Sequence, residues 1–127
     1  DIKGNLINSG EVQAIDNISV SGNVNNNGEI LTNNSFSAKD TVTTKKLIAK
    51  EEITTDKLEN KGTVATNKDL NINKDLINSG NIQAIGKISV AENTNNTGEI
   101  LTNSSFTSKN LFIKLPLSKE SVYNFQF

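Results

Sequence analysis

The chain has 127 residues, of which 34% are hydrophobic and 5% aromatic, and its formal net charge is −1. It has no Cys or His, which excludes a zinc site of the usual kind, a thiol nucleophile and a Ser-His-Asp triad. All 13 basic residues are Lys, so the balanced charge and the missing Arg give no reason to expect nucleic-acid binding.

The first repeated segment, residues 5–39, returns at 75–109 with 23 identities in 35 aligned positions. A shorter period lies inside it. Asn-x-Gly tripeptides recur along the chain with their glycines at Gly10, Gly28, Gly62, Gly80 and Gly98. The successive differences in residue number are 18, 34, 18 and 18. We interpret the long interval as two units, of 18 and then 16, with the intermediate glycine replaced near Lys46.

Aligning the units on these glycines places apolar residues in three columns. Two positions after Gly stand Val12, Ile30, Ile48, Val64, Ile82 and Ile100. Eight positions after Gly stand Ile18, Phe36, Leu70, Ile88 and Phe106. Fourteen positions after Gly stand Val24, Val42, Leu76, Thr94 and Phe112, joined by Leu6 and Leu58. Alternation with period 2 around each column predicts three short strands per unit. We therefore expect an all-β, parallel β-helix of roughly six to seven coils of about 18 residues.

The Asn that precedes each of these glycines by two positions forms a further column: Asn8, Asn26, Asn60, Asn78 and Asn96. An inward Asn at a corner can bond to the turn backbone and to the Asn above and below it. We assign this column a structural role and not a catalytic one. We also expect each following glycine to serve by tolerating a positive φ.

Two segments depart from the repeat. The charge spacing within residues 46–58 could support a short helix, but the β-branched run at 53–55 and the flanking register favour a shortened coil with a charged outer face. We therefore assign residues 1–115 to the β-helix, with 46–58 as an irregular coil. Pro116 breaks the repeat, and we assign residues 116–127 to a capping strand or to the boundary of the fragment.

The segments LINSGEVQAIDNISVSGNVNNNGEI and LENKGTVATNKDLNINKDLINSGNIQAIGKISV resemble the haemagglutinin repeats of filamentous-haemagglutinin-type exoproteins. The recurring form is L-x-N-x-G-x-[IV]-x-[AT], and the resemblance covers about residues 5–113. It implies a right-handed parallel β-helix, export by two-partner secretion through an outer-membrane transporter, and a location outside the cell or on the bacterial surface. It further implies a virulence-related role as an adhesin or as the stalk of a contact-dependent inhibition toxin. The irregular coil and the aromatic tail depart from the family pattern.

The leading functional hypothesis is a non-catalytic rod segment of a bacterial surface-exposed or secreted adhesin. Its Asn-rich corners, 25–27 and 95–96, could contact cell-surface glycans or proteins, or could be solvated turns. A passenger fragment of an autotransporter is an alternative.

A carbohydrate-active β-helix enzyme fragment is a second alternative. Glu11 and Glu29 are expected to stack about 4.8 Å apart on adjacent coils, where they could hold a cation, with Glu99 in the same column. We expect instead that these acids are solvated and that the chain has no catalytic, cofactor or metal site. Ice binding is disfavoured because Thr32, Thr66 and Thr102 fall in an inward, interrupted column.

The ends of the chain predict its nearest partners. It starts at Asp1 and has no Met, so we expect upstream and downstream parts of a larger parent chain, including the export signal. The free edge of a β-helix templates further strand pairing. We therefore expect the N-terminal coil to be open and capable of end-to-end self-association, and the tail to blunt the C-terminal end.

Overall fold

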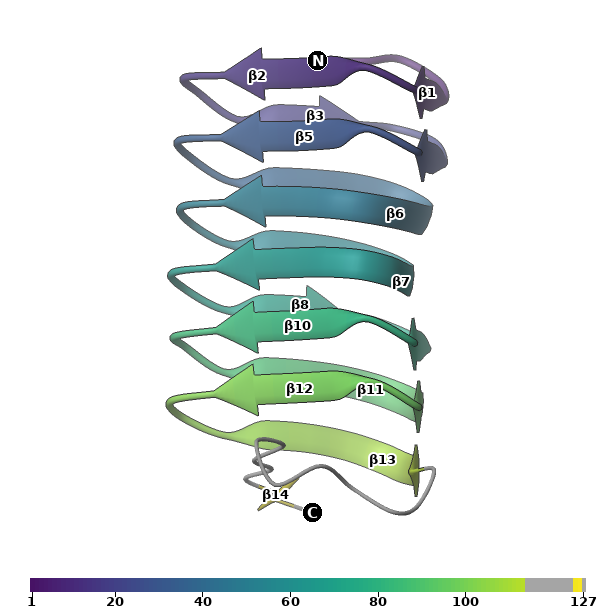
Figure 1. Cartoon of the computed structure of the whole chain (residues 1–127), viewed down its shortest axis with the longest axis vertical. Helices are drawn as coiled ribbons and strands as arrows, with labels where there is room; N and C mark the ends of the chain where they lie inside the picture. The colour runs from purple at the N-terminus through teal and green to yellow at the C-terminus, as the bar shows by residue number, and fades with distance from the viewer. Residues whose placement is uncertain (114–124, 127) are drawn as a thin grey trace.

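The computed structural model describes residues 1–113 and 125–126. Over these residues the chain is all-β, without a helix, and winds into a right-handed parallel β-helix of six complete coils (Figure 1). Residues 111–113 begin a seventh coil. The pairings between the described strands are parallel, as the stacking of successive coils requires. The predicted fold class is confirmed.

Each coil contributes one short strand to each of three sheet faces, which we number in chain order. Face 1 is formed by β1 (Leu6–Asn8), β4 (Val24–Asn26), β9 (Leu76–Asn78) and parts of β6 (Phe36–Ala49), β7 (Ile53–Thr66), β11 (Ile88–Asn96) and β13 (Phe106–Ile113). Face 2 is formed by β2 (Glu11–Ala14), β5 (Glu29–Thr32), β10 (Asn81–Ala84), β12 (Glu99–Thr102) and the ends of β6 and β7. Face 3 is formed by β3 (Ile18–Val20), β8 (Leu70–Ile72), β14 (Phe125–Gln126) and the starts of β6, β7, β11 and β13.

The register between coils follows the period of the corner glycines except in the middle of the rod. Val12 pairs with Ile30, and Ile82 pairs with Ile100, each one full period further along the chain. Between them, Ile30 pairs with Leu47 and Leu47 with Val64, so on face 2 the long interval divides into two equal halves. On face 1 it divides into the unequal units that the sequence predicts, because Asn26 pairs with Thr44 and Thr44 with Asn60. The prediction that Ile48 points inward was wrong: Leu47 is fully buried, and Ile48 lies on the outer side.

The physical reason is a corner that is one residue short. Thr44 pairs with Asn26 and Asn60, but Lys46 pairs with Thr63, so a single residue, Lys45, spans this corner of the coil. Lys45 therefore takes the place of the corner glycine, one position earlier than the sequence pattern suggested.

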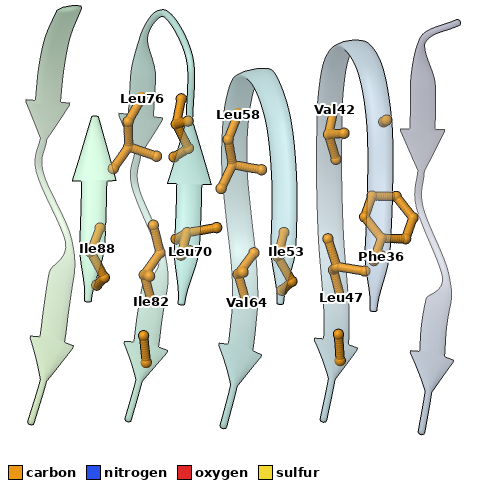
Figure 2. Close-up of a cluster of buried hydrophobic side chains, with 14 of the residues drawn as sticks. Phe36, Val42, Leu47, Ile53, Leu58, Val64, Leu70, Leu76, Ile82 and Ile88 are labelled. Atoms are coloured by element: carbon orange, nitrogen blue, oxygen red, sulfur yellow. The ribbon is translucent and has the colours of Figure 1, made fainter. Parts of the chain in front are cut away.

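The inward columns stack into a continuous apolar core (Figure 2). On face 2 the column contains Ile30, Leu47, Val64, Ile82 and Ile100, with Val12 half-buried in the first coil. On face 3 it contains Ile18, Phe36, Ile53, Leu70, Ile88 and Phe106. Ile53 is the member that the sequence alignment left out. Each fully buried large side chain contributes about 1.5–3 kcal/mol, so a narrow core is enough when every coil covers the next.

Face 1 ends differently from the prediction. Its inward column runs through Val24, Val42, Leu58, Leu76 and Thr94. The next member is Leu111, which pairs with Thr94, whereas Phe112 is 58% exposed. The assignment of Phe112 to this column was wrong because β13 is one residue short after Ser108, where its register to β11 shifts.

The segment 46–58 is extended and not helical, because β6 and β7 pair along it. Paired residues across this coil are closer in sequence than in the regular coils, for example Val42 with Leu58 and Phe36 with Ile53. The coil is therefore shortened, as the sequence predicts. At the other end of the chain, β14 pairs in parallel with residues 106–107 of β13. Pro116 and most of the tail lie outside the described residues.

A column of buried Asn side chains closes the corner between faces 1 and 2. Asn8, Asn26, Asn60, Asn78 and Asn96 are each at most 8% exposed. Their amides bond along the axis: Asn8 Nδ2 donates to Asn26 Oδ1, Asn60 Nδ2 to Asn78 Oδ1, and Asn78 Nδ2 to Asn96 Oδ1, each at 2.8 Å. Thr44 replaces Asn in the short corner and accepts from Asn26 Nδ2 at 3.0 Å. These contacts give the Asn column its structural role.

The glycines of this corner serve by their size and not by a positive φ. Only Gly4 among the described residues has a positive φ, so the expectation of left-handed corners was wrong. A Cβ at Gly28 would collide with the carbonyl oxygen of Gly10, and one at Gly80 would collide with that of Gly62. Close stacking of successive corners therefore excludes a side chain.

Candidate functional surfaces

The inside of the rod is filled, so functional groups must lie on its outer side. The described residues leave no buried side-chain nitrogen or oxygen without a hydrogen bond. The hydroxyl groups of the inward Thr side chains also form hydrogen bonds inside the rod. Thr32 Oγ1 donates to the carbonyl oxygen of Asp16 at 2.5 Å, Thr102 Oγ1 to that of Gly86 at 2.6 Å, and Thr66 Oγ1 to that of Glu51. The three Thr are buried, so they present no surface to ice.

The two candidate carboxylates lie side by side on face 2, and each has a different side-chain partner. Glu11 and Glu29 are register partners on adjacent coils, as the sequence predicts. Glu29 Oε1 instead accepts from Lys46 Nζ at 3.1 Å, and Glu11 Oε1 accepts from the Gln13 amide. Glu99 lies opposite Asn81, and no other described carboxylate is its register partner. No group of three or more Asp or Glu among residues 1–113 and 125–126 is placed to hold a metal ion.

The Asn-rich corners divide into buried and exposed members. Asn26 and Asn96 belong to the inner ladder and cannot reach a ligand. Asn25, Asn27 and Asn95 are exposed. The proposed polar contacts to glycans or proteins are therefore limited to these three side chains.

Face 3 presents one small polar side chain per coil. The outward column consists of Ser19, Ser37, Thr54, Asn71, Ser89 and Thr107. A shallow groove of about 410 Å³ crosses it, bordered by Lys39, Asp56 and Asn73. The Asp56 carboxylate accepts a hydrogen bond from Asn73 Nδ2 at 3.1 Å and forms an ion pair with Lys74 Nζ at 3.7 Å. The outward column itself is uncharged, and it offers hydroxyl and amide groups at the coil spacing of about 4.8 Å.

Two equivalent pockets lie on face 2, one in each half of the long repeat. The first, of about 380 Å³, is lined by Gln13, Ala14, Ile15, Leu31 and Asn33. The second, of about 210 Å³, is lined by Gln83, Ala84, Ile85, Leu101, Thr102 and Asn103. Ile15 and Ile85 are 81% and 53% exposed, at a corner where other coils carry Asn or Lys.

Sequence reasoning missed these pockets although a signal was present. Gln13-Ala14-Ile15 returns unchanged at 83–85, and each Ile breaks an otherwise polar column. Four coils separate the copies, which is about 19 Å along the axis.

Comparison with models of protein families, with characterised proteins and with solved structures finds no match to the chain. The part of the chain that the structure describes has no helix long and apolar enough to cross a membrane.

Proposed function

We propose that the chain is a rod segment of a bacterial surface-exposed or secreted adhesin of the filamentous-haemagglutinin type, with no catalytic role of its own. The observation that carries this proposal is the uninterrupted stacking of six coils, each hydrogen-bonded to the next on all three faces. In such a solenoid, length is proportional to coil number, and the backbone bonds run along the axis. This is the property required to hold a binding region away from a cell.

The outer surface supports the same role. The stacked acids on face 2 are each engaged by another side chain, Glu29 by Lys46 and Glu11 by Gln13, which favours a surface role for them over a catalytic one. The partners that we assign are the adjoining parts of the parent chain, an outer-membrane transporter during export, and glycans or proteins on a host or bacterial surface.

The location is tested on intact cells that produce the parent protein with an epitope tag placed in an exposed loop. Added protease should remove the tag from intact cells as fully as from lysed cells. A tag that is digested only after lysis would contradict the proposal.

The spacer role is tested by an adhesion assay with parent proteins that lack one or two complete coils of this segment. Export should be unchanged, because each shortened protein keeps its column register. Cell attachment should fall with each coil removed. Full attachment by a segment that has lost two coils would show that reach is not its function.

A further inference from the structure

The short corner between faces 1 and 2 opens a recess in the wall of the rod. Coil 3 spans this corner with Lys45 alone, whereas both neighbouring coils use two residues, 27–28 and 61–62. Each neighbouring coil therefore places two residues opposite the single Lys45. This is the geometry of a β-bulge, which changes the direction of the side chains around it. The result is a pocket of about 340 Å³, bordered by Gly28 and Gly62 and by Glu29, Lys45, Lys46 and Lys61.

The charge in this recess is unbalanced. Of its three ammonium groups, only that of Lys46 has a carboxylate partner, Glu29 at 3.1 Å. Lys45 and Lys61 are exposed and form no ion pair with any described residue. Glu59, two residues before Lys61, forms none either. Like charges on neighbouring strands repel, and a bound anion would relieve this repulsion.

The basic corner is specific to these two adjacent coils, which carry Lys45 and Lys61. The same corner in the other coils carries Ser9, Asn27, Ser79 and Thr97 between the Asn and the Gly, and none of these is charged. The whole chain is slightly acidic, so the recess is a local reversal of the overall charge.

We propose that this recess binds an oxyanion, a phosphate or carboxylate group, between the ammonium groups of Lys45 and Lys61. Lysine is a compact charge with three donors and binds such groups as a point charge. The corner amides cannot help, because Gly28 N and Gly62 N already donate to Asn26 Oδ1 and Asn60 Oδ1. The two lysines therefore supply the affinity, and a dianion binds more tightly than a monoanion. The group can belong to a free ion or to an anionic polymer.

The proposal is tested on the purified chain at low ionic strength by following backbone amide shifts during titration with inorganic phosphate. Residues 44–46 and 61–63 should shift together and saturate with one dissociation constant. The double variant Lys45→Gln, Lys61→Gln should bind about tenfold more weakly, as expected for loss of hydrogen bonds to a charged group. A control pair with the same loss of charge, Lys68→Gln with Lys87→Gln, should leave the constant unchanged, since both side chains are exposed elsewhere on the rod.

Two further measurements complete the test. At equal concentration, phosphate should raise the melting temperature of the wild type more than that of the double variant, because stabilisation by a ligand of the native state grows with the ratio of its concentration to its dissociation constant. Acetate should bind more weakly than phosphate. Repeating the titration with long-chain polyphosphate at equal phosphate concentration identifies the source, since tighter binding of the polymer at the same residues assigns the site to a polymer. Shifts spread over all lysines without saturation, or equal binding by the double variant, would overturn the proposal.

Discussion

Each buried Asn of the ladder bonds within its own corner and to a neighbouring coil, and Asn78 has partners in three successive coils. Asn78 Nδ2 donates to Asn96 Oδ1 at 2.8 Å and to the carbonyl oxygens of Glu99 and Gly80 at 3.0 and 3.2 Å. Its Oδ1 accepts from Gly80 N at 3.2 Å and from Asn60 Nδ2 at 2.8 Å. Because the corner is buried, these groups cannot bond to water instead if the Asn amide is removed.

The first prediction is that Asn78→Ala lowers the free energy of unfolding by about 2–4 kcal/mol, because several buried polar groups lose their partner at once. Denaturant unfolding measures the change. The matched control is Asn95→Ala on the outer side of the same face, which should stay within about 0.5 kcal/mol. Equal changes in the two variants would contradict the assignment of the ladder.

The second prediction concerns the aromatic members of face 3. Phe36 is fully buried and stacks between Ile18 and Ile53. Phe36→Ala should cost about 3–5 kcal/mol through lost burial and the cavity that remains. Asn33→Ala, at an exposed turn of the same coil, should stay within about 0.5 kcal/mol. A small effect at Phe36 with a large one at Asn33 would mean that the inward columns are misassigned.

A corner glycine is required for close stacking only when the corner of a preceding coil lies directly against it. The Cβ of an alanine at Gly80 would point at the carbonyl oxygen of Gly62, while one at Gly10 would meet no atom within 4 Å. Both residues follow the Asn of the ladder by two positions and lack a positive φ. They differ because Gly80 stacks on the corner that contains Gly62, whereas Gly10 lies in the first coil and has no corner before it.

The third prediction follows from this difference. Gly80→Ala should destabilise the chain by about 1–3 kcal/mol, because the corner backbones must move apart. Gly10→Ala should be neutral or stabilising by about 0.4–1 kcal/mol, since alanine reduces the freedom of the unfolded chain. Thermal or denaturant unfolding of the two variants distinguishes the outcomes. A stabilised Gly80→Ala would show that the corners are more widely spaced than described.

The sequence pattern predicted the strands and the register wherever an Asn-x-Gly corner is present. It failed by one residue at Leu47 and Ile48, because both are aliphatic and alternation alone does not say which points inward. The deciding fact was the length of the corner at Lys45, which depends on pairing with two other coils. The same error occurred at Leu111 and Phe112, where another one-residue deletion precedes two adjacent apolar side chains.

The function of individual side chains was less accessible to sequence reasoning. The Asn ladder could be predicted because a column of one residue type is visible in the alignment. The collision that excludes a Cβ at Gly28 and Gly80 could not be predicted from the sequence, because it depends on the distance between stacked corners. The lysine recess was also hidden, because it arises where the repeat is broken and Lys45 comes beside Lys61.

For the whole molecule, stability should be a sum over coils and their contacts. Each coil pairs with the one before and the one after, as the stacked strands of Figure 1 show. A solenoid of this kind tolerates the loss of a complete unit, provided that the new neighbours have the same columns. Gly80 and Glu99 offer such a junction, since Glu also follows Gly10 and Gly28 in the first two corners.

The last prediction is that deleting residues 81–98 leaves a folded rod that is one coil shorter. Ile100 would then stack on Val64, Phe106 on Leu70, and Leu111 on Leu76, which are the column partners that the deleted coil separates. Unfolding should remain cooperative, with a loss of about 1–3 kcal/mol for the missing coil, and small-angle scattering should show a particle about 4.8 Å shorter. Deleting only residues 81–89 removes half a coil and sets apolar columns against polar ones, so that variant should not fold. If both deletions fold equally well, or if both unfold, the coil is not the unit of this structure.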